Sequence, residues 1–335
     1  MSLLDSITNR WIVAIDGGGS KVAGAIAPLN ATGCFEISQA IPYSVRLKSA
    51  GVGSAALATW KDARINLVSM LDNLLDQAGA NSNEVAHAVL MLAGAGRPAD
   101  VQRVTESLLE RASFRACAQL TVTSDIGPLI QYACDLDPKS PAIVVIAGTG
   151  SLVGAIDTNR NLIRAGGWGP VLGDDASGWR IALGALKPIC MWIDRGNPNE
   201  EPPEALEIVS KFLSEKRLLP DRDQLNSALI ALAGDRHLAA QLAPEILKLS
   251  TTTEGTATYR FVRGQFWLLV KQIEDVHQRL GVNSDWRLCL AGGLASNDPL
   301  YQDFLKAELE LRRIPPVSIT VLDPVEAGLR FATRT

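Results

Sequence analysis

The chain has 335 residues, of which 47% are hydrophobic and 20% charged, and its formal net charge is −4 at pH 7. This composition is typical of a globular protein with an ordinary core, and the length is sufficient for two domains. No block of like charge is present, which argues against a nucleic-acid or membrane-surface partner.

The cysteines and histidines predict no metal site. The five cysteines are scattered and form no CxxC pair, which fits neither a disulfide framework nor a zinc site and favours a reducing cytoplasm. The first ten residues lack a basic segment followed by an apolar one, so we expect no signal peptide. The histidines, which are expected to be surface or core residues, are His87, His237 and His277.

The first half of the chain alternates apolar runs with turn signals in a βββαβαβα order. Three short apolar segments come first, separated by turns as in strands joined by hairpins. The next helix carries apolar residues in steps of three and four, with Ser54 as a candidate N-cap and Gly79 just past its end. The expected strands are 11–16, 22–28, 34–41, 86–94 and 119–125, and later helices are expected near 99–112 and from about 127.

The second half repeats this plan, so the chain is interpreted as a duplication. AIDGGGS in the first half resembles IAGTGS in the second, and LMLAGAG resembles LCLAGGL. The second copy is longer because about 184–285 has the pattern of several helices and no strand. Two similar domains that face each other form a cleft, to which each contributes one glycine turn, and such clefts are favoured ligand sites.

Asp16 opens the first glycine-rich turn, DGGGSK, at the end of an apolar run. Glycine N–H groups can approach a phosphate closely, but an acid would repel the phosphate unless a cation lies between them. Mg²⁺ binds one or two carboxylates together with phosphate oxygens and water, so we predict that Asp16 binds Mg²⁺. A structural glycine hairpin with a capping aspartate is the alternative. The residues predicted to bind nucleotide here are Gly17, Gly18, Gly19, Ser20 and Lys21.

Two further glycine segments are candidates for nucleotide binding. AGTGS supplies N–H groups and two hydroxyls, and it leads into a strand, whereas a dinucleotide-binding turn should open a helix. LAGGLASN has two glycines after a strand, where a flat base or ribose could approach the backbone; a plain strand-to-helix turn is the alternative. The residues concerned are Gly148, Thr149, Gly150, Ser151, Gly292 and Gly293.

Asp125 is the candidate general base. It follows the apolar run of TVTSD, where a carboxylate can project into a cleft and take a proton from a hydroxyl nucleophile. The alternative is an N-cap for the helix that follows, since aspartate is a favoured cap, and the two roles can coexist.

The stretch GGWGPVLGDDASGW at 166–179 is the most distinctive in the chain. A rigid glycine-rich loop with Trp168 and Asp174 could bind a polar ring, because the aromatic ring packs against it and the acid accepts hydroxyl protons. The alternative is a tight turn in which Asp174 or Asp175 caps the next helix.

Taken in order, these five stretches resemble the BadF/BadG-type ATPase family and its N-acetylglucosamine and glucosamine kinase members, within the sugar kinase/actin/Hsp70 superfamily. The resemblance runs from IDGGGSK to PVEAGLRFA at 324–332. It implies an α/β fold of duplicated ribonuclease H-like (actin-like ATPase) domains around a central cleft. We expect domains at 1–122 and 123–335, the second with the helical insertion, and a last helix that packs back on the first domain.

The resemblance also implies roles for the motifs. DGGGSK and AGTGS are then the phosphate segments, LAGGLASN is the adenosine segment and Asp125 is the catalytic base. GWGPVLGDDASGW matches the family's GWG…GDEGS loop, so the implied substrate residues are Trp168, Gly169, Asp174 and Ser177. There are two departures: DDAS replaces DEGS, and Lys48 falls near the position of a sugar-contacting Asn in the hexosamine kinases.

We therefore expect a cytoplasmic, homodimeric kinase that uses ATP and Mg²⁺ to phosphorylate N-acetylglucosamine or glucosamine. One alternative is an ATPase that activates a dehydratase through a shared iron–sulfur cluster, which would need suitably clustered cysteines. A kinase of the ROK type would need a Cys/His zinc site. A nucleotide- or sugar-binding regulator without turnover is a third alternative, which the presence of both Asp16 and Asp125 disfavours.

Overall fold

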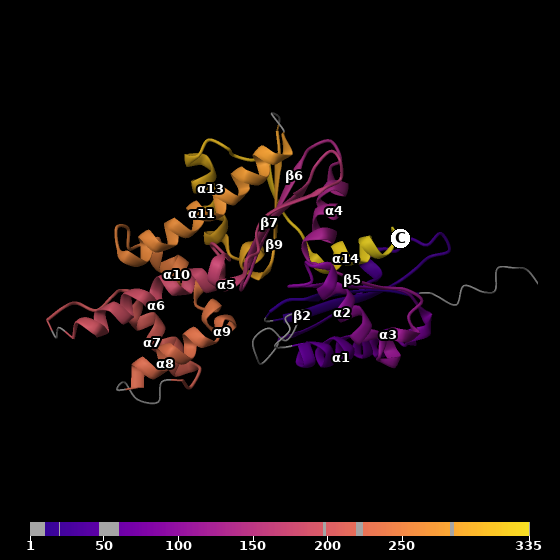
Figure 1. Ribbon diagram of the computed structural model, residues 1–335, viewed down its shortest axis with the longest axis horizontal. Helices are drawn as coiled ribbons and strands as arrows, with labels where there is room; N and C mark the ends of the chain where they lie inside the picture. The colour runs from indigo at the N-terminus through magenta and orange to yellow at the C-terminus, as the bar shows by residue number, and fades with distance from the viewer. Residues whose placement is uncertain are drawn as a thin grey trace, which may run out of the picture. The chain divides into compact units, whose positions relative to one another are not determined.

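The computed structural model describes residues 11–19, 21–46, 60–196, 199–218, 224–281 and 285–334. The chain forms two compact units, one of Met1–Pro138 with Leu322–Thr335 and the other of Lys139–Val321 (Figure 1). The first unit extends beyond the expected boundary at 122/123. It does so because α4 (Ile126–Leu136), which follows its last strand, packs on the C-terminal helix α14 (Pro324–Ala332) of the same unit.

The first unit is built on a mixed five-stranded sheet in the order β3-β2-β1-β4-β5. The strand β1 pairs antiparallel with β2, which pairs antiparallel with β3, while β4 is parallel to β1 and β5 is parallel to β4. The strand bounds are β1 Trp11–Gly17, β2 Lys21–Pro28, β3 Ile41–Arg46, β4 Val85–Leu92 and β5 Leu120–Thr123.

Both faces of this sheet are covered, so β1 is buried from Ile12 to Ile15. Its alternate residues point to opposite faces. Val13 and Ile15 pack in a cluster with residues of α1 and α2, whereas Ile12 and Ala14 pack in another with residues of α14 (Figure 1). The helices on the first face are α1 Trp60–Ala78, α2 Pro98–Leu109 and the short α3 Ala112–Ala116.

The third strand lies later than expected. Residues 34–39 are mostly exposed and include the 3₁₀ helix η1 (Ile37–Gln39), so the strand expected at 34–41 is instead β3 at Ile41–Arg46. Pro42 is tolerated there because β3 is an edge strand, where a missing backbone N–H can face away from the sheet. A second 3₁₀ helix, η3, spans Ser82–Glu84 before β4.

The second unit repeats the topology of the first. Its sheet has the order β10-β9-β6-β7-β8, which, read from β8, is the same arrangement of antiparallel and parallel neighbours. The duplicated α/β fold expected from the sequence is therefore confirmed. The strand bounds are β6 Ala142–Ala147, β7 Ser151–Ile156, β8 Leu162–Gly166, β9 Arg287–Ala291 and β10 Ser318–Val321.

The helices of the second unit are concentrated between β8 and β9, in the region expected to be a helical insertion. The long α11 packs on β7, β8 and α13, and it carries part of the core on its buried face. The helix bounds are α5 Gly169–Leu172, α6 Gly178–Arg195, α7 Ala205–Glu215, α8 Leu225–Gly234, α9 Arg236–Ala240, α10 Ala243–Ser250, α11 Ala257–Leu280, α12 Gly293–Asn297 and α13 Pro299–Leu311.

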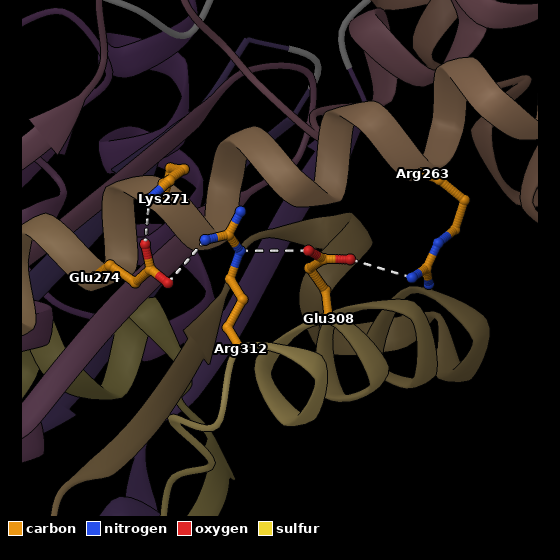
Figure 2. Close-up of polar contacts among 5 residues, drawn as sticks. All are labelled: Arg263, Lys271, Glu274, Glu308 and Arg312. Carbon is orange, nitrogen blue, oxygen red and sulfur yellow. Dashed lines mark hydrogen bonds and ion pairs between the residues drawn. The ribbon is translucent and has the colours of Figure 1, made fainter.

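An ion-pair network joins α11 to α13 (Figure 2). The buried Glu308 of α13 pairs with Arg263 of α11 at 3.1 Å and with Arg312 at 3.3 Å, and Arg312 reaches Glu274 of α11 at 2.9 Å. Lys271 pairs with the same Glu274 at 2.9 Å. The network joins α13 to α11, and α11 supports part of the candidate site described below.

Within the described part of the chain, no helix combines the length and the hydropathy that a membrane span requires.

Candidate active site

In the first unit, Asp16 is the penultimate residue of β1 and is only partly buried, in contrast to the four apolar residues before it. The hairpin from β1 to β2 follows directly, and Gly18 N donates to Lys21 O across it at 3.0 Å. The predicted glycine turn is therefore present as a hairpin, while Ser20 lies outside the described residues. Lys48, the residue noted near the family's Asn position, also lies outside them.

Asp16 is in an acidic environment. Burial and, to a smaller extent, the negative charges of Asp125 and Asp323 together raise the pKa of its carboxyl to about 7, although Lys21 lowers it. Asp125 follows β5, and Asp323 directly precedes α14. A bound cation would relieve this repulsion, so the donor set fits a hard divalent ion such as Mg²⁺.

Such an ion would need ligands from outside the protein. In the described ranges, no group of three or more His, Cys, Asp or Glu side chains is arranged to hold a metal ion. Mg²⁺ commonly binds one carboxylate and completes its shell with water and phosphate oxygens. The arrangement around Asp16 is therefore suited to a metal that arrives with a nucleotide.

Asp125 occupies the N-cap position of α4, but its backbone is helical, with φ −57° and ψ −32°. Among the described residues, its side chain accepts no capping hydrogen bond from the first turn of this helix. Asp323 is different, because its Oδ1 accepts from Val325 N at 2.7 Å and from Glu326 N at 2.9 Å at the start of α14. The geometry thus disfavours the helix-cap alternative for Asp125. Asp323, by contrast, does cap its own helix, α14.

In the second unit, the turn after β6 is tightly folded. Gly148 N donates to Gly150 O at 2.9 Å, and Ser151 N donates to Asp174 Oδ1 at 3.3 Å. The amides of Thr149 and Gly150 have no hydrogen-bond partner in the described part of the chain. These two N–H groups, rather than that of Ser151, are therefore available to a phosphate.

The loop of 166–178 lies against this turn. A Cβ on Gly150 would be 3.0 Å from Asp174 Oδ1, so a side chain at this position would crowd the acid. Gly178 N donates to Gly148 O at 2.8 Å, and Ser151 Oγ donates to Asp175 O at 2.7 Å. The structure thus brings the predicted phosphate turn and the predicted sugar loop together within one unit.

Two non-glycine residues of this loop are strained. Asp174 has φ 62° and Ala176 has φ 55°, a left-handed conformation that costs about 1–2 kcal/mol per residue. Such outliers persist only where neighbours over-determine them. Here Gln265 and Gln272 of α11 support the loop: Gln265 Oε1 accepts from Ala176 N at 3.4 Å, and Gln272 Nε2 donates to Asp175 Oδ2 at 2.7 Å.

Asp174 is buried, with 5% of its surface exposed. Burial raises the pKa of its carboxyl, and the hydrogen bond from Ser151 and the charges of Arg236 and Arg180 partly offset this. Arg236 Nη1 is 3.8 Å from Asp174 Oδ2. The loop therefore buries an acid beside the phosphate turn with a positive charge close to it.

The remaining predicted residues of the loop have contrasting environments. Trp168 is 69% exposed, and Gly169 opens the short α5 beside it. Ser177 is fully buried and caps α6, because its Oγ accepts from Arg180 N at 3.3 Å. The turn alternative required Asp174 or Asp175 to cap α6. The cap is instead Ser177.

The third glycine segment adjoins the second. Gly292 has φ 89°, and a Cβ at this position would be only 2.6 Å from Ala147 O, so the segment after β9 runs directly beside the end of β6. A Cβ on Gly148 would likewise be 3.7 Å from Gly293 N. Since β6 and β9 are parallel neighbours, LAGG and AGTGS occupy the same edge of the sheet.

Several residues that contact these motifs in the structure were not predicted as site residues from the sequence. The cap role of Asp323 had a signal, since aspartate before proline typically starts a helix. Gln265 and Gln272 are seven residues apart and so share one helix face, but nothing in the sequence relates that face to the loop. Arg236 and His237 lie in the helical insertion without any motif.

The two α/β units share one topology, and each has a glycine hairpin after its first strand, as expected for the duplicated α/β fold. Residues 13–319 match the family model described as the BadF/BadG/BcrA/BcrD ATPase family. The chain belongs to this family, as its motifs predicted.

Two relatives are similar in sequence. An N-acetylmuramic acid/N-acetylglucosamine kinase of Clostridium acetobutylicum is 25% identical over 186 residues, 56% of this chain and 55% of that protein. An N-acetyl-D-glucosamine kinase of Dictyostelium discoideum is 23% identical over 338 residues, 95% of this chain and 96% of that protein. The chain therefore spans about half the length of the first relative and nearly all of the second.

The fold is similar to that of the crystal structure of a proposed N-acetylglucosamine kinase from Chromobacterium violaceum. The TM-score is 0.65 and the identity 18%, over 97% of this chain and 99% of that one. At this identity the likeness concerns the fold alone.

Proposed function

We propose that this protein transfers the terminal phosphoryl group of ATP to a hydroxyl of an amino sugar, N-acetylglucosamine or glucosamine. One observation carries the proposal: the glycine hairpin of the first unit is accompanied by two acids, Asp16 and Asp125, that interact electrostatically. A phosphate-binding hairpin needs a metal to tolerate one acid, and a hydroxyl nucleophile needs a base. Membership of an ATPase family and the two kinases that resemble the chain support the same activity.

The roles of the residues follow from their chemistry. Mg²⁺, held at Asp16, supplies positive charge to the phosphates when it is bound. The amides of Thr149 and Gly150 donate to phosphate oxygens, and the backbone at Gly292 and Gly293 accommodates the adenosine. Asp125 orients the sugar hydroxyl and takes its proton as the oxygen bonds to phosphorus and the bond from that phosphorus to the ADP oxygen breaks.

The sugar is assigned to the loop of the second unit. We propose that Trp168 packs on the sugar ring, with Gly169 beside it, and that Asp174 accepts hydrogen bonds from sugar hydroxyls. Ser177 is fully buried as the cap of α6, so we assign it to the support of this loop and not to sugar contact.

The test is an ADP-release assay over glucosamine, N-acetylglucosamine, N-acetylmuramic acid and glucose, with mass spectrometry of the product. We expect sugar-dependent ADP release that EDTA abolishes and added Mg²⁺ restores. ADP release that is equal with and without every sugar would instead identify an ATPase. Nucleotide or sugar binding without any turnover would identify a regulator.

Variants of Asp174 test the sugar assignment. Asp174→Asn keeps an oxygen that can accept from Ser151 N, so the phosphate turn should persist while the charge is lost. We expect kcat/KM for the sugar to fall about 5- to 150-fold, as for a lost buried hydrogen bond of about 1–3 kcal/mol, and ATP affinity to stay within about 2-fold. Asp174→Ala also removes the contact to the turn, so it should lower both.

Steady-state kinetics with each substrate varied in turn and calorimetric titration of nucleotide separate the two ligands. A loss confined to ATP affinity in the Asp174→Asn protein would mean that Asp174 serves the nucleotide and not the sugar.

A further inference from the structure

His237 lies in the helical insertion and yet contacts the phosphate turn. Its Nδ1 is 3.1 Å from Thr149 Oγ1, although 88 residues separate the two in sequence. The side chain is buried, with 6% of its surface exposed. From the sequence, His237 was expected to be an ordinary core or surface residue. Its contact with the turn of Thr149 therefore has no role assigned so far.

The backbone around His237 is fixed. Asp235 caps the short α9, its Oδ1 accepting from His237 N at 3.1 Å and from Leu238 N at 3.0 Å. The helix α9 packs on α6, whose first residue, Gly178, donates to Gly148 O. Because α9 and the turn are both tied to the start of α6, the imidazole is held in place relative to Thr149.

The proton on the ring can be assigned by elimination. Burial, together with the positive charge of Arg236, lowers the pKa of His237 to about 4 against a raising by Asp235, so the ring is neutral near pH 7 and carries one N–H. Nε2 is buried and has no hydrogen-bond partner in the described ranges. A proton there would be a buried unsatisfied donor, which is costly, whereas a proton on Nδ1 is donated to Thr149 Oγ1.

This tautomer decides what the Thr149 hydroxyl can do. An oxygen that accepts from His237 Nδ1–H keeps its own proton for another acceptor. The Thr149 amide also lacks a partner in the described part of the chain, so the residue presents two donors. A phosphate oxygen is the acceptor that this pair of donors suits.

We propose that His237 is a positioning residue for nucleotide binding, which holds the Thr149 hydroxyl so that it donates its proton to a phosphate oxygen of the nucleotide. The inference rests on the proposed function only in taking the turn of Thr149 as a nucleotide-phosphate site. It extends that site to a helix of the insertion.

The test is calorimetric binding of Mg²⁺ with a non-hydrolysable ATP analogue to the full chain. We expect Thr149→Val to weaken binding about 10- to 100-fold, as for a lost hydrogen bond to a charged group. We expect His237→Leu to weaken it about 5- to 20-fold. In the double variant, His237→Leu should add almost nothing to Thr149→Val, because its effect passes through the hydroxyl.

Two further variants keep the test decisive if His237→Leu folds poorly. The side-chain nitrogen of Asn is as many bonds from the backbone as Nδ1, and that of Gln as many as Nε2. His237→Asn should therefore bind the analogue within about 3-fold of the parent chain, while His237→Gln should resemble His237→Leu. The matched control is His277→Asn. His277 lies on α11, with its ring beside that of Trp286, and this change should leave binding unchanged.

Equal losses from His237→Leu with and without the Thr149 hydroxyl would overturn the inference, as would unchanged binding in both His237→Leu and His237→Gln. The readout does not involve the sugar. A non-additive cycle in a protein that phosphorylates no sugar would overturn only the proposed function, and an additive cycle in an active kinase would overturn only this inference.

Discussion

The Asp125→Asn protein is expected to lose kcat by about 10²–10⁴-fold, the usual contribution of a general base, while it binds ATP and sugar within a few-fold of the parent chain. Asparagine keeps the shape of the side chain and can still orient a hydroxyl, but it cannot take the proton. Single-turnover and steady-state kinetics, together with separate binding measurements, distinguish a loss of chemistry from a loss of affinity.

Thermal unfolding supplies the control for this prediction. The alternative role of Asp125 as a helix cap predicts a less stable Asp125→Ala protein and nearly normal kcat in Asp125→Asn. Asp323 is the matched comparison, because it accepts two capping hydrogen bonds at the start of α14. Asp323→Ala should therefore lose about 0.5–2 kcal/mol of stability, and Asp125→Ala should lose less. A fully active Asp125→Asn enzyme would end the general-base assignment.

The parts of the fold that could be predicted are those with a local signal. The fully buried run of Ile12–Ile15 followed by glycines identifies a central strand and its hairpin, and the same pattern recurs at β6. Because the two patterns repeat in order, the duplication follows from the sequence. The prediction of a strand at 34–41 was wrong, because most of residues 34–39 are exposed and Phe35 and Ala40 are only partly buried.

The candidate site divides in the same way. Asp16 and the glycine turns are recognisable because hairpin, acid and glycine are contiguous in sequence. The residues that support the loop of 166–178 are not recognisable from the sequence. Gln265 and Gln272 bond to this loop from α11, but the sequence of α11 shows only the periodicity of its core face. The contact of His237 with Thr149 depends on tertiary packing over 88 residues and leaves no local trace.

Asp16→Asn is expected to change activity and stability in opposite directions. Loss of the carboxylate removes the proposed Mg²⁺ ligand, so turnover should fall by at least about 10²-fold, as for several kcal/mol of lost charge stabilisation. The same substitution removes a partly buried charge that the charges of Asp125 and Asp323 repel. The variant should therefore be more stable than the parent chain when neither metal nor nucleotide is present.

The stabilisation should depend on pH in a defined direction. The pKa of Asp16 is raised from 3.8 to about 7 in the folded chain, so between these values the folded state keeps a proton that the unfolded state has lost. The free energy of unfolding of the parent chain therefore falls as pH rises through this window. Asp16→Asn lacks this loss, so it should match the parent near pH 4 and exceed it by about 1–3 kcal/mol above pH 7, the partial exposure of the carboxyl limiting the gain.

Denaturant unfolding of both proteins in EDTA from pH 4 to pH 8.5 measures this difference. Asp62→Asn, a change at an exposed acid in the first turn of α1, is the control and should keep the pH dependence of the parent. Added Mg²⁺ and nucleotide should stabilise the parent more than Asp16→Asn, because only the parent retains the proposed ligand. Parallel pH profiles for Asp16→Asn and the parent would contradict the acidic environment assigned to Asp16, and undiminished turnover in the variant would contradict its role in binding the metal.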